Sequence, residues 1–160
     1  YFRFVWVGGG YEPDKDQGYS VYLHEQVKRS GLADRFTFLG EVADIQAVYD
    51  QTDVFLLTSR LDPLPNVGVD AICNGLPIFC FGDASGIADI LIHEGYADEL
   101  VAPYMDIEAM ASQVLVAAST PEKRAALKRR LQSSAQRVFS MSRYAQAIGD
   151  EAEALMRQSA

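Results

Sequence analysis

The sequence predicts an α/β fold, a doubly wound, Rossmann-like parallel sheet with helices on both faces. Short apolar runs rich in β-branched and aromatic residues alternate with stretches whose apolar residues recur at helical spacing. Strands that alternate with helices in this way are usually parallel and covered on both sides. With 160 residues, 49% of them hydrophobic and 22% charged, the chain can build one core. We therefore expect residues 1–160 to form a single domain.

Five apolar runs are predicted to be strands. Each is bounded by glycine, proline or a polar loop, which interrupt regular structure. They are FRFVWVG at 2–8, RFTFLG at 35–40, DVFLLTS at 53–59, PIFCF at 77–81 and ELVAP at 99–103.

The segments between these runs carry helix start and stop signals. The predicted helices are 19–31, 44–51, 66–75, 86–95 and 106–119, then one that opens at Thr120-Pro121 and one after Ser142. The expected N-caps are Asp44, Asn66 and Asp106, and the glycines expected to close helices are Gly31 and Gly75.

Charge is distributed unevenly along the chain. The net charge of −8 opposes binding to nucleic acid. Between Glu41 and Thr120 there are thirteen acidic residues and a single basic one, Arg60. Residues 121–143 hold seven basic residues and one acid. A solvated helix face is the favoured interpretation of that segment, and contact with an anionic membrane is the alternative.

The cysteines and histidines do not form a metal-binding pattern. Cys73 and Cys80 are seven positions apart in apolar surroundings, and we expect both to be buried, reduced thiols. His24 and His93 have no partner at ligand spacing in the sequence, so no zinc site is expected.

Ligands of doubly wound domains bind at the carboxyl ends of the strands, in the loops that lead into helices. Four loops fall at that edge: Gly8–Gly10, Glu41–Val42, the loop that holds Asp62, and residues 82–86. The glycine run is not a dinucleotide fingerprint, since Pro13 stands where G-x-G-x-x-G needs glycine. We interpret it as a turn that lets a ligand or backbone approach closely.

Two acids lie around the start of a predicted helix. Asp62 follows a strand and Asp70 lies one turn into the helix, so both can face the edge where ligands bind. Between them, Asn66 and Val67 present free backbone N–H groups at the helix N-terminus, which attract anions. This set suits a phosphorylated, polyhydroxylated ligand such as a sugar nucleotide. A plainer alternative stays open: Asp70 only stabilises the helix macrodipole and Asp62 only caps the loop.

Longer segments around these residues resemble the C-terminal, donor-binding domain of retaining GT-B glycosyltransferases of the GT4, or group 1, family. FVWVGGG at 4–10 is similar to the family's second strand and glycine turn, and residues 31–60 resemble the segment that leads to its signature. LDPLPNVGVDAICNGLPIFCF at 61–81 resembles the signature, which is two acids with seven residues between them followed by Ala-x-x-x-Gly-x-Pro. ASGIADIL at 84–91 resembles the Gly-Gly-x-x-Glu loop.

The resemblance implies roles for individual residues. Asp62 would contact the donor sugar at its reacting end and is the implied catalytic residue. Asp70 would accept hydrogen bonds from the ribose, and the amides of Asn66 and Val67 would bind the diphosphate. The other implied donor-binding residues are Glu41 and Val42 at the nucleobase, Ser85 and Gly86 near the donor, and Gly8 and Gly9 in the glycine turn.

The chain departs from the family pattern at three places in the site. Asp62 and Asp70 are one methylene shorter than the usual Glu, so the backbone must supply the missing reach. Pro65 replaces a frequent glycine and offers no N–H group to the sugar. Ser85 takes the place of the first glycine of its loop.

The resemblance implies transfer of a sugar from an NDP-sugar to a saccharide or lipid-linked acceptor, with retention of anomeric configuration. It implies no metal and no cofactor, because the family holds the leaving diphosphate with cations and a helix dipole. We expect a cytoplasmic protein, with peripheral membrane contact through 121–143 as an alternative. The alternative functions are a non-catalytic nucleotide-sugar-binding module and a GT-B-type sugar-nucleotide epimerase.

The segment that would precede Tyr1 in the family carries the first strand, its helix and the Arg and Lys that neutralise the diphosphate. We therefore expect the chain to be a piece of a two-domain protein, inactive alone. Loss of a central strand would leave unpaired backbone groups on the strands that contain Val5 and Phe55. We expect these strands either to pair directly or to associate with another chain.

Overall fold

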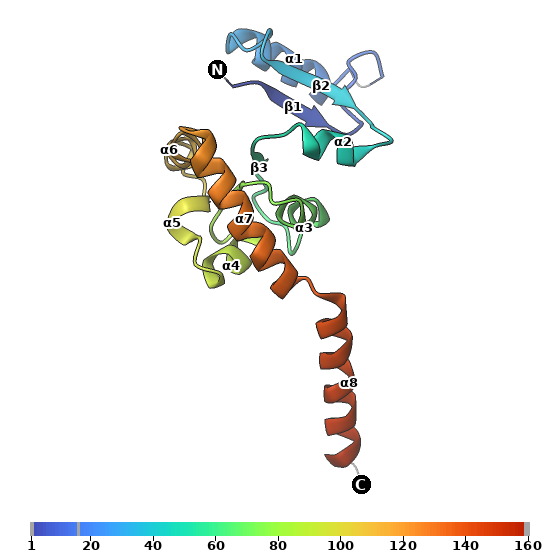
Figure 1. The fold of residues 1–160 in the computed structure, drawn as a ribbon. Coiled ribbons are helices and arrows are strands. Elements are labelled where there is room, and N and C mark those ends of the chain that lie inside the picture. Colours follow the sequence, from blue (N-terminus) through green and yellow to red (C-terminus); the bar gives the residue numbers. More distant parts are fainter. Residues whose placement is uncertain (1, 16, 159–160) are drawn as a thin grey trace. The chain divides into compact units, whose positions relative to one another are not determined.

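Strands and helices alternate through the computed structural model, which describes residues 2–15 and 17–158 (Figure 1). The chain divides into two compact units, Tyr1–Val48 and Tyr49–Ala160, and each is described by itself. That the whole chain behaves as one domain stays a prediction.

The first unit is a parallel pair of strands with one helix packed against it. Strand β1 (Phe4–Val7) pairs with β2 (Phe36–Gly40), and helix α1 (Tyr19–Arg29) lies between them in sequence. The ring of His24 on α1 stacks on that of Phe38 on β2, with 4.3 Å between ring centroids. Aromatic contacts therefore hold the helix to the strand pair.

The second unit contains a parallel sheet whose described strands run in the order β3 (Phe55–Leu57), β4 (Ile78–Phe81) and β5 (Val101–Ala102). All four residues of β4 are buried. Because successive side chains of a strand point to opposite faces, both faces of β4 are covered. The helices from α2 onward are α2 (Ile45–Asp50), α3 (Asn66–Cys73), α4 (Gly86–His93), α5 (Ala97–Leu100), α6 (Ile107–Ala117), α7 (Pro121–Val138) and α8 (Met141–Gln158).

These features confirm the predicted α/β class with parallel strands. Within the first unit β1 pairs with β2, and within the second β3 pairs with β4. Direct pairing of the strands that contain Val5 and Phe55 stays a prediction. Association with another chain stays a prediction.

Two of the three predicted N-caps are confirmed. Asp44 Oδ1 accepts from the Ala47 amide at 3.2 Å, and Asp106 Oδ1 accepts from the Ala109 amide at 2.9 Å. At the predicted start of α7, Thr120 Oγ1 accepts from the Lys123 amide at 3.2 Å. These bonds satisfy helix amides that have no partner inside their own helix.

Asn66 is not an N-cap, which corrects the prediction. Helix α3 begins at Asn66, and Pro65 holds the cap position with an extended backbone (φ −66°, ψ 125°) and no side-chain cap bond. The fixed φ of proline sets this entry into the helix without help from a side chain. At the other end Asn74 is the C-cap, and Gly75 follows it in the left-handed region at φ +71°.

The strand predicted at 99–103 is shorter than expected. Ala97–Leu100 forms helix α5, and β5 begins only at Val101. Asp98 and Glu99 lie in the first turn of α5, where acidic side chains favour the helix dipole. Leu100 is fully buried at the end of this turn. The run predicted as a single strand therefore forms the end of a helix followed by a short strand.

The two cysteines differ in environment. Cys80 on β4 is buried, and burial raises the pKa of its thiol to about 12. Cys73 is exposed, which corrects the expectation that both are buried. The buried residues of α3 are Gly68, Ala71 and Ile72, and Cys73 lies off that face.

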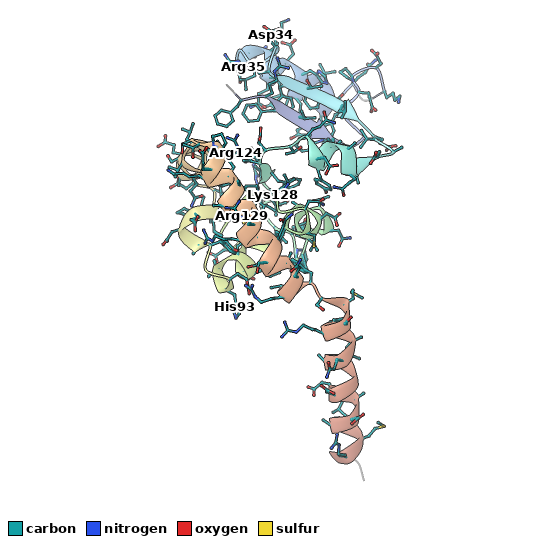
Figure 2. All side chains as sticks on the ribbon, viewed as in Figure 1. Asp34, Arg35, His93, Arg124, Lys128 and Arg129 are labelled. Carbon is teal, nitrogen blue, oxygen red and sulfur yellow. The ribbon has the colours of Figure 1, made fainter. Side chains whose placement is uncertain are left out.

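Several basic residues of segment 121–143 are paired with acids of the second unit (Figure 2, where Arg124, Lys128 and Arg129 are labelled). The pairs are Arg124 with Asp53 at 3.6 Å, Arg130 with Glu99 at 2.8 Å and Arg137 with Glu94 at 2.6 Å. The three arginine side chains remain partly exposed in these pairs, which supports the favoured interpretation of a solvated helix face. Of the described helices, none has the length and apolar composition needed to cross a bilayer.

Helix α8 exposes an apolar stripe. Met141, Tyr144, Ile148, Leu155 and Met156 are between 53% and 74% exposed. They recur at the spacing of one helix face, with the charged residues on the opposite side.

Candidate functional site

The loop after β3 and the loop after β4 are bonded to each other. The amide of Asp62 donates to the Ala84 carbonyl at 2.9 Å, and the amide of Gly86 donates to the Pro63 carbonyl at 2.9 Å. Asp62 and Ser85 thereby form an isolated parallel bridge. Two of the loops singled out in the sequence therefore meet at the carboxyl end of the sheet.

Two glycines allow this close packing. A Cβ atom on Gly86 would lie 2.4 Å from the carbonyl oxygen of Pro63, and one on Gly68 would lie 2.7 Å from Ile87 Cγ1. Gly86 thus lets the two loops touch, and Gly68 lets α3 pack against α4. Since the Gly86 amide already donates to Pro63, a ligand contact at this residue must come from another atom.

The first turn of α3 has two free amides. The N–H groups of Gly68 and Val69 both donate to the Pro65 carbonyl, at 2.9 and 3.2 Å. Those of Asn66 and Val67 have no acceptor among the described residues, and both residues are exposed. Free amides at the positive end of a helix dipole attract anions, so this turn can hold a phosphate group.

Asp70 lies on the exposed surface of α3, one turn after Asn66 and Val67. Burial raises the pKa of the Tyr49 hydroxyl, and partial desolvation raises that of the thiol of Cys73, a residue exposed as a whole; the negative charge of Asp70 raises both pKa values further. Within the described part of the chain, no hydrogen bond or ion pair involves the carboxylate of Asp70.

Tyr49 is not among the site residues predicted from the sequence. It lies at the end of α2, far from Asp70 in the chain, and its side chain is buried. An apolar position at helical spacing is ordinarily a core residue, so no local pattern separates it from its neighbours.

The carboxylate of Asp62 is also unpaired among the described residues, and this side chain is half-buried. Its bridge partner Ser85 has a buried Oγ without a hydrogen-bond partner. Asp83, in the same loop, has φ +58°, a conformation that is uncommon for residues other than glycine and often found at functional sites. Asp83 is not among the site residues predicted from the sequence, because no local pattern indicates such a backbone conformation.

The remaining predicted residues, Gly8, Gly9, Glu41 and Val42, lie in the first unit. The Gly8 amide donates to the Gly40 carbonyl at 2.9 Å, and a Cβ atom on Gly9 would lie 2.8 Å from Glu41 Oε1. The atoms close to Gly9 belong to the Glu41 side chain, so the predicted approach of a ligand or of backbone to the glycine run stays a prediction. Glu41 is exposed and Val42 is half-buried.

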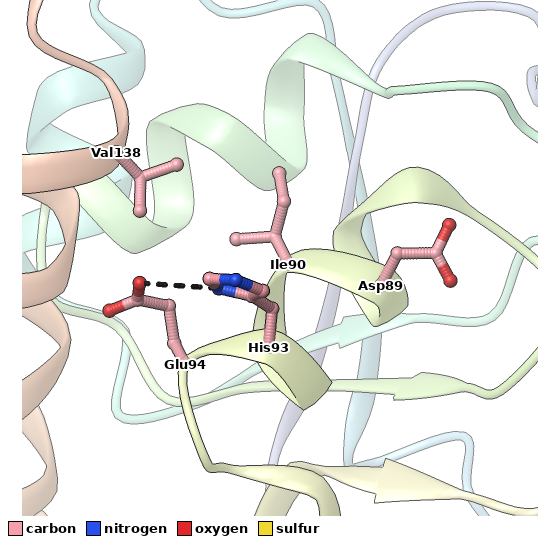
Figure 3. Close-up of a pocket in the computed structure, with 5 residues that line it drawn as sticks. All are labelled: Asp89, Ile90, His93, Glu94 and Val138. Carbon is pink, nitrogen blue, oxygen red and sulfur yellow. Dashed lines mark ion pairs between the residues drawn. The ribbon is translucent and has the colours of Figure 1, made fainter.

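A shallow hollow of about 290 Å³ lies between α4 and the end of α7 (Figure 3). In it the Nδ1 atom of His93 lies 3.8 Å from Glu94 Oε1. Its lining residues are Asp89, Ile90, His93, Glu94 and Val138. None of these is a predicted site residue, so the hollow is separate from the candidate site.

The candidate site combines two kinds of group in the second unit. The carboxylates of Asp62 and Asp70 can accept hydrogen bonds from hydroxyl groups, and the amides of Asn66 and Val67 can donate to phosphate oxygens. A family model described as "Glycosyl transferases group 1" matches residues 1–120. The chain belongs to the group 1 glycosyltransferase family.

Curated relatives of this group 1 glycosyltransferase chain are distant. Mannosylfructose-phosphate synthase of Agrobacterium fabrum (strain C58 / ATCC 33970) is 34% identical over 73 residues, which are 44% of this chain and 16% of that protein. The lipopolysaccharide core biosynthesis mannosyltransferase LpsB of Rhizobium meliloti (strain 1021) is 25% identical over 135 residues, which are 84% of this chain and 38% of that protein. The chain thus spans well under half the length of these relatives.

Solved structures share the fold of this group 1 chain. HepE of Anabaena, in complex with UDP, has a TM-score of 0.80 at 24% identity, covering 96% of this chain and 41% of that one. Sucrose-phosphate synthase from Thermosynechococcus elongatus has a TM-score of 0.75 at 22% identity, covering 96% and 38%. The C-terminal domain of LpcC, a group 1 protein of Francisella tularensis, has a TM-score of 0.68 at 12% identity, covering 88% and 87%. The fold is that of a GT-B C-terminal domain.

Proposed function

We propose that this chain is the donor-binding domain of a retaining glycosyltransferase that transfers a hexose from an NDP-sugar to a saccharide or lipid-linked acceptor. The observation that carries the proposal is the combination, in one unit, of the free α3 amides with the unpaired carboxylates of Asp62 and Asp70. An NDP-sugar offers the matching groups, a diphosphate and several hydroxyls. HepE, which shares the fold, has been crystallised with UDP and with UDP-glucose, which supports a nucleotide-sugar donor.

Negative charge grows on the diphosphate as the bond between its oxygen and the anomeric carbon breaks. A new bond forms from the acceptor oxygen to the same face of that carbon, and the acceptor proton leaves with the phosphate oxygen. The amides of Asn66 and Val67, together with the α3 dipole, stabilise the departing charge. Because Gly68 packs α3 closely against α4, these donors are held in place before the reaction.

The two carboxylates bind different parts of the donor outside the diphosphate. Asp70 accepts hydrogen bonds from the ribose hydroxyls, and Asp62 contacts the sugar near its reacting carbon. Residues of the other loops complete the donor site: Glu41 and Val42 at the nucleobase, Ser85 and Gly86 near the sugar, and Gly8 and Gly9 in the glycine turn.

Cations for the diphosphate must come from outside the stretch that holds the acids. Between Glu41 and Thr120 the thirteen acidic residues face a single arginine, Arg60. An acidic surface repels a diphosphate unless neighbouring cations offset it. Residues 1–160 alone are therefore proposed to bind a donor weakly and not to transfer it.

A screen of UDP-, GDP- and ADP-sugars against the intact protein tests the proposal. We expect one nucleotide class to raise the unfolding temperature and to support transfer in the presence of EDTA. NMR of the product should show the anomeric configuration of the donor. Absence of binding to all three classes, or a product of inverted configuration, would contradict the proposal.

A further inference from the structure

Ser85 stands at the N-cap position of α4, but its hydroxyl does not cap the helix. The backbone of Ser85 is extended, with φ −161° and ψ 155°, and its side chain makes no cap bond to the described residues. A serine at this position ordinarily accepts a hydrogen bond from an amide of the first turn. Here the Ala88 amide donates to the carbonyl oxygen of Ser85 instead, at 2.9 Å. The hydroxyl of Ser85 therefore takes no part in starting the helix.

The same hydroxyl is buried without a hydrogen-bond partner. Among the described residues, the buried side-chain atoms that lack a partner are Ser85 Oγ and Gln113 Oε1. The Gln113 side chain is still held by its nitrogen, since Nε2 donates to the carbonyls of Asp98 and Val101 at 3.2 and 3.1 Å. The side chain of Ser85 has no second polar atom. Because buried hydroxyl groups almost always have a partner, we expect Ser85 to gain one when the site is occupied.

The carboxylate of Asp62 is the acceptor that the backbone places beside Ser85. The two residues form a parallel bridge, and bridge partners lie about 4.8 Å apart with their side chains on the same face. The Asp62 side chain is half-buried, and its carboxylate has no hydrogen bond or ion pair within the described residues. Rotation of the Ser85 side chain between staggered rotamers can turn its hydroxyl toward this carboxylate while the bridge stays intact.

The charged side chains on the neighbouring elements do not occupy this place. All of them are exposed, and within the described part of the chain none forms an ion pair with Asp62; they are Arg60, Asp70, Asp83 and Asp89. A cation would neutralise the Asp62 carboxylate, whereas a hydroxyl orients it and leaves its negative charge. The proposed reaction needs that charge, because the anomeric carbon becomes positive as its bond to the phosphate oxygen breaks.

We propose that Ser85 is a positioning residue whose hydroxyl donates a hydrogen bond to the Asp62 carboxylate in the donor complex. The inference rests on the proposed function, in which Asp62 contacts the sugar near its reacting carbon. A bound donor excludes water from the two loops, which strengthens a hydrogen bond to a charged acceptor. Because the hydroxyl acts through Asp62, Ser85 contributes to binding of the sugar and not to binding of the nucleotide.

A double-mutant cycle on the intact protein tests the proposal. The dissociation constants of the free nucleoside diphosphate and of the UDP-, GDP- or ADP-sugar that the screen identifies are measured for the parent, Ser85→Ala, Asp62→Ala and the double variant. We expect Ser85→Ala to bind the nucleoside diphosphate within about twofold of the parent and the NDP-sugar about tenfold more weakly. In the Asp62→Ala background, adding Ser85→Ala should change neither constant by more than about twofold.

Ser59→Ala is the matched control, because Ser59 is half-buried in the loop of Asp62 but lies outside the bridge. It should leave both dissociation constants unchanged. Alanine at position 85 keeps the backbone bonds between the two loops, so the variant should fold. Loosened loops would weaken binding of the nucleoside diphosphate as well, so the difference between the two ligands separates positioning from folding.

The proposal is overturned if Ser85→Ala binds the NDP-sugar as tightly as the parent. It is also overturned if the loss is equal with and without Asp62, since the hydroxyl would then contact the sugar itself. A parent that binds no NDP-sugar would overturn the proposed function as well. A parent that binds one and is unaffected by Ser85→Ala would overturn this inference alone.

Discussion

Replacing Gly86 with alanine should force apart the two loops that carry Asp62 and Ser85. The new Cβ would lie 2.4 Å from the Pro63 carbonyl oxygen, so backbone rather than a flexible side chain must move. Overpacking of this kind costs about 1–3 kcal/mol, and loss of the hydrogen bond from Gly86 to Pro63 costs about 0.5–1.5 kcal/mol more. We expect the free energy of unfolding to fall by about 1.5–4.5 kcal/mol.

Urea unfolding of the parent and of Gly86→Ala measures this loss directly. Gly82→Ala is the matched control in the same loop, because its Cβ would meet its nearest atom, the Ala102 carbonyl oxygen, at an ordinary 3.6 Å. The control should change the free energy of unfolding by no more than about 0.5 kcal/mol.

Donor binding, measured on the same variant, tests whether this loop contact affects function. If the bonded loops position Asp62 and Ser85, Gly86→Ala should weaken binding of the NDP-sugar under conditions where the variant is still folded. A variant that unfolds at the same urea concentration as the parent and binds the donor equally well would refute the reasoning about this contact.

Three further predictions concern single carboxylates. Asp70→Ala should weaken binding of the free nucleotide by about 1.5–3 kcal/mol, the range for a charged hydrogen bond, and unchanged affinity in a folded variant would remove it from the ribose site. Asp62→Ala should leave binding of the nucleoside diphosphate unchanged and abolish sugar transfer. If nucleotide binding and transfer fall equally, Asp62 does not have the separate sugar-binding role proposed for it. Hydrogen bonds from Ser134 and Arg137 lower the pKa of Glu94, so its stabilisation is present above the unfolded carboxyl pKa of about 4.3 and is lost as pH falls through the lower folded value. Urea midpoints measured from pH 7 to pH 3 should therefore fall less steeply for Glu94→Gln than for the parent, and parallel curves would contradict this account.

Local patterns predicted those features whose partners lie within a turn of the chain. Asp106 caps α6 because the Ala109 amide is three residues away, and Gly31 ends α1 because its backbone needs a positive φ, here +68°. The same reasoning found the free amides of Asn66 and Val67, since the first turn of any helix leaves such groups.

Contacts between distant segments could not be predicted in this way. The hydrogen bond from the Gly86 amide to the Pro63 carbonyl joins two loops that only the completed sheet brings together. The family resemblance implied a position for Gly86 near the donor, but it could not indicate that the Gly86 amide donates within the fold. The negative charge of Asp70 adds to the raised pKa of Tyr49, which lies far from it in the chain and whose sequence pattern is that of a core residue.

Helix α8 affects how unfolding of this chain can be measured. Its apolar stripe is exposed and Gly149 interrupts its interior, where glycine costs about 1 kcal/mol relative to alanine. Without burial of an apolar face, a helix of this length is held mainly by its own backbone bonds and frays gradually with temperature. Its amide hydrogens should exchange with solvent much faster than those of β4, and far-ultraviolet circular dichroism should slope before the core melts. A broad helical signal would then report the opening of one peripheral segment while the buried sheet remains cooperative.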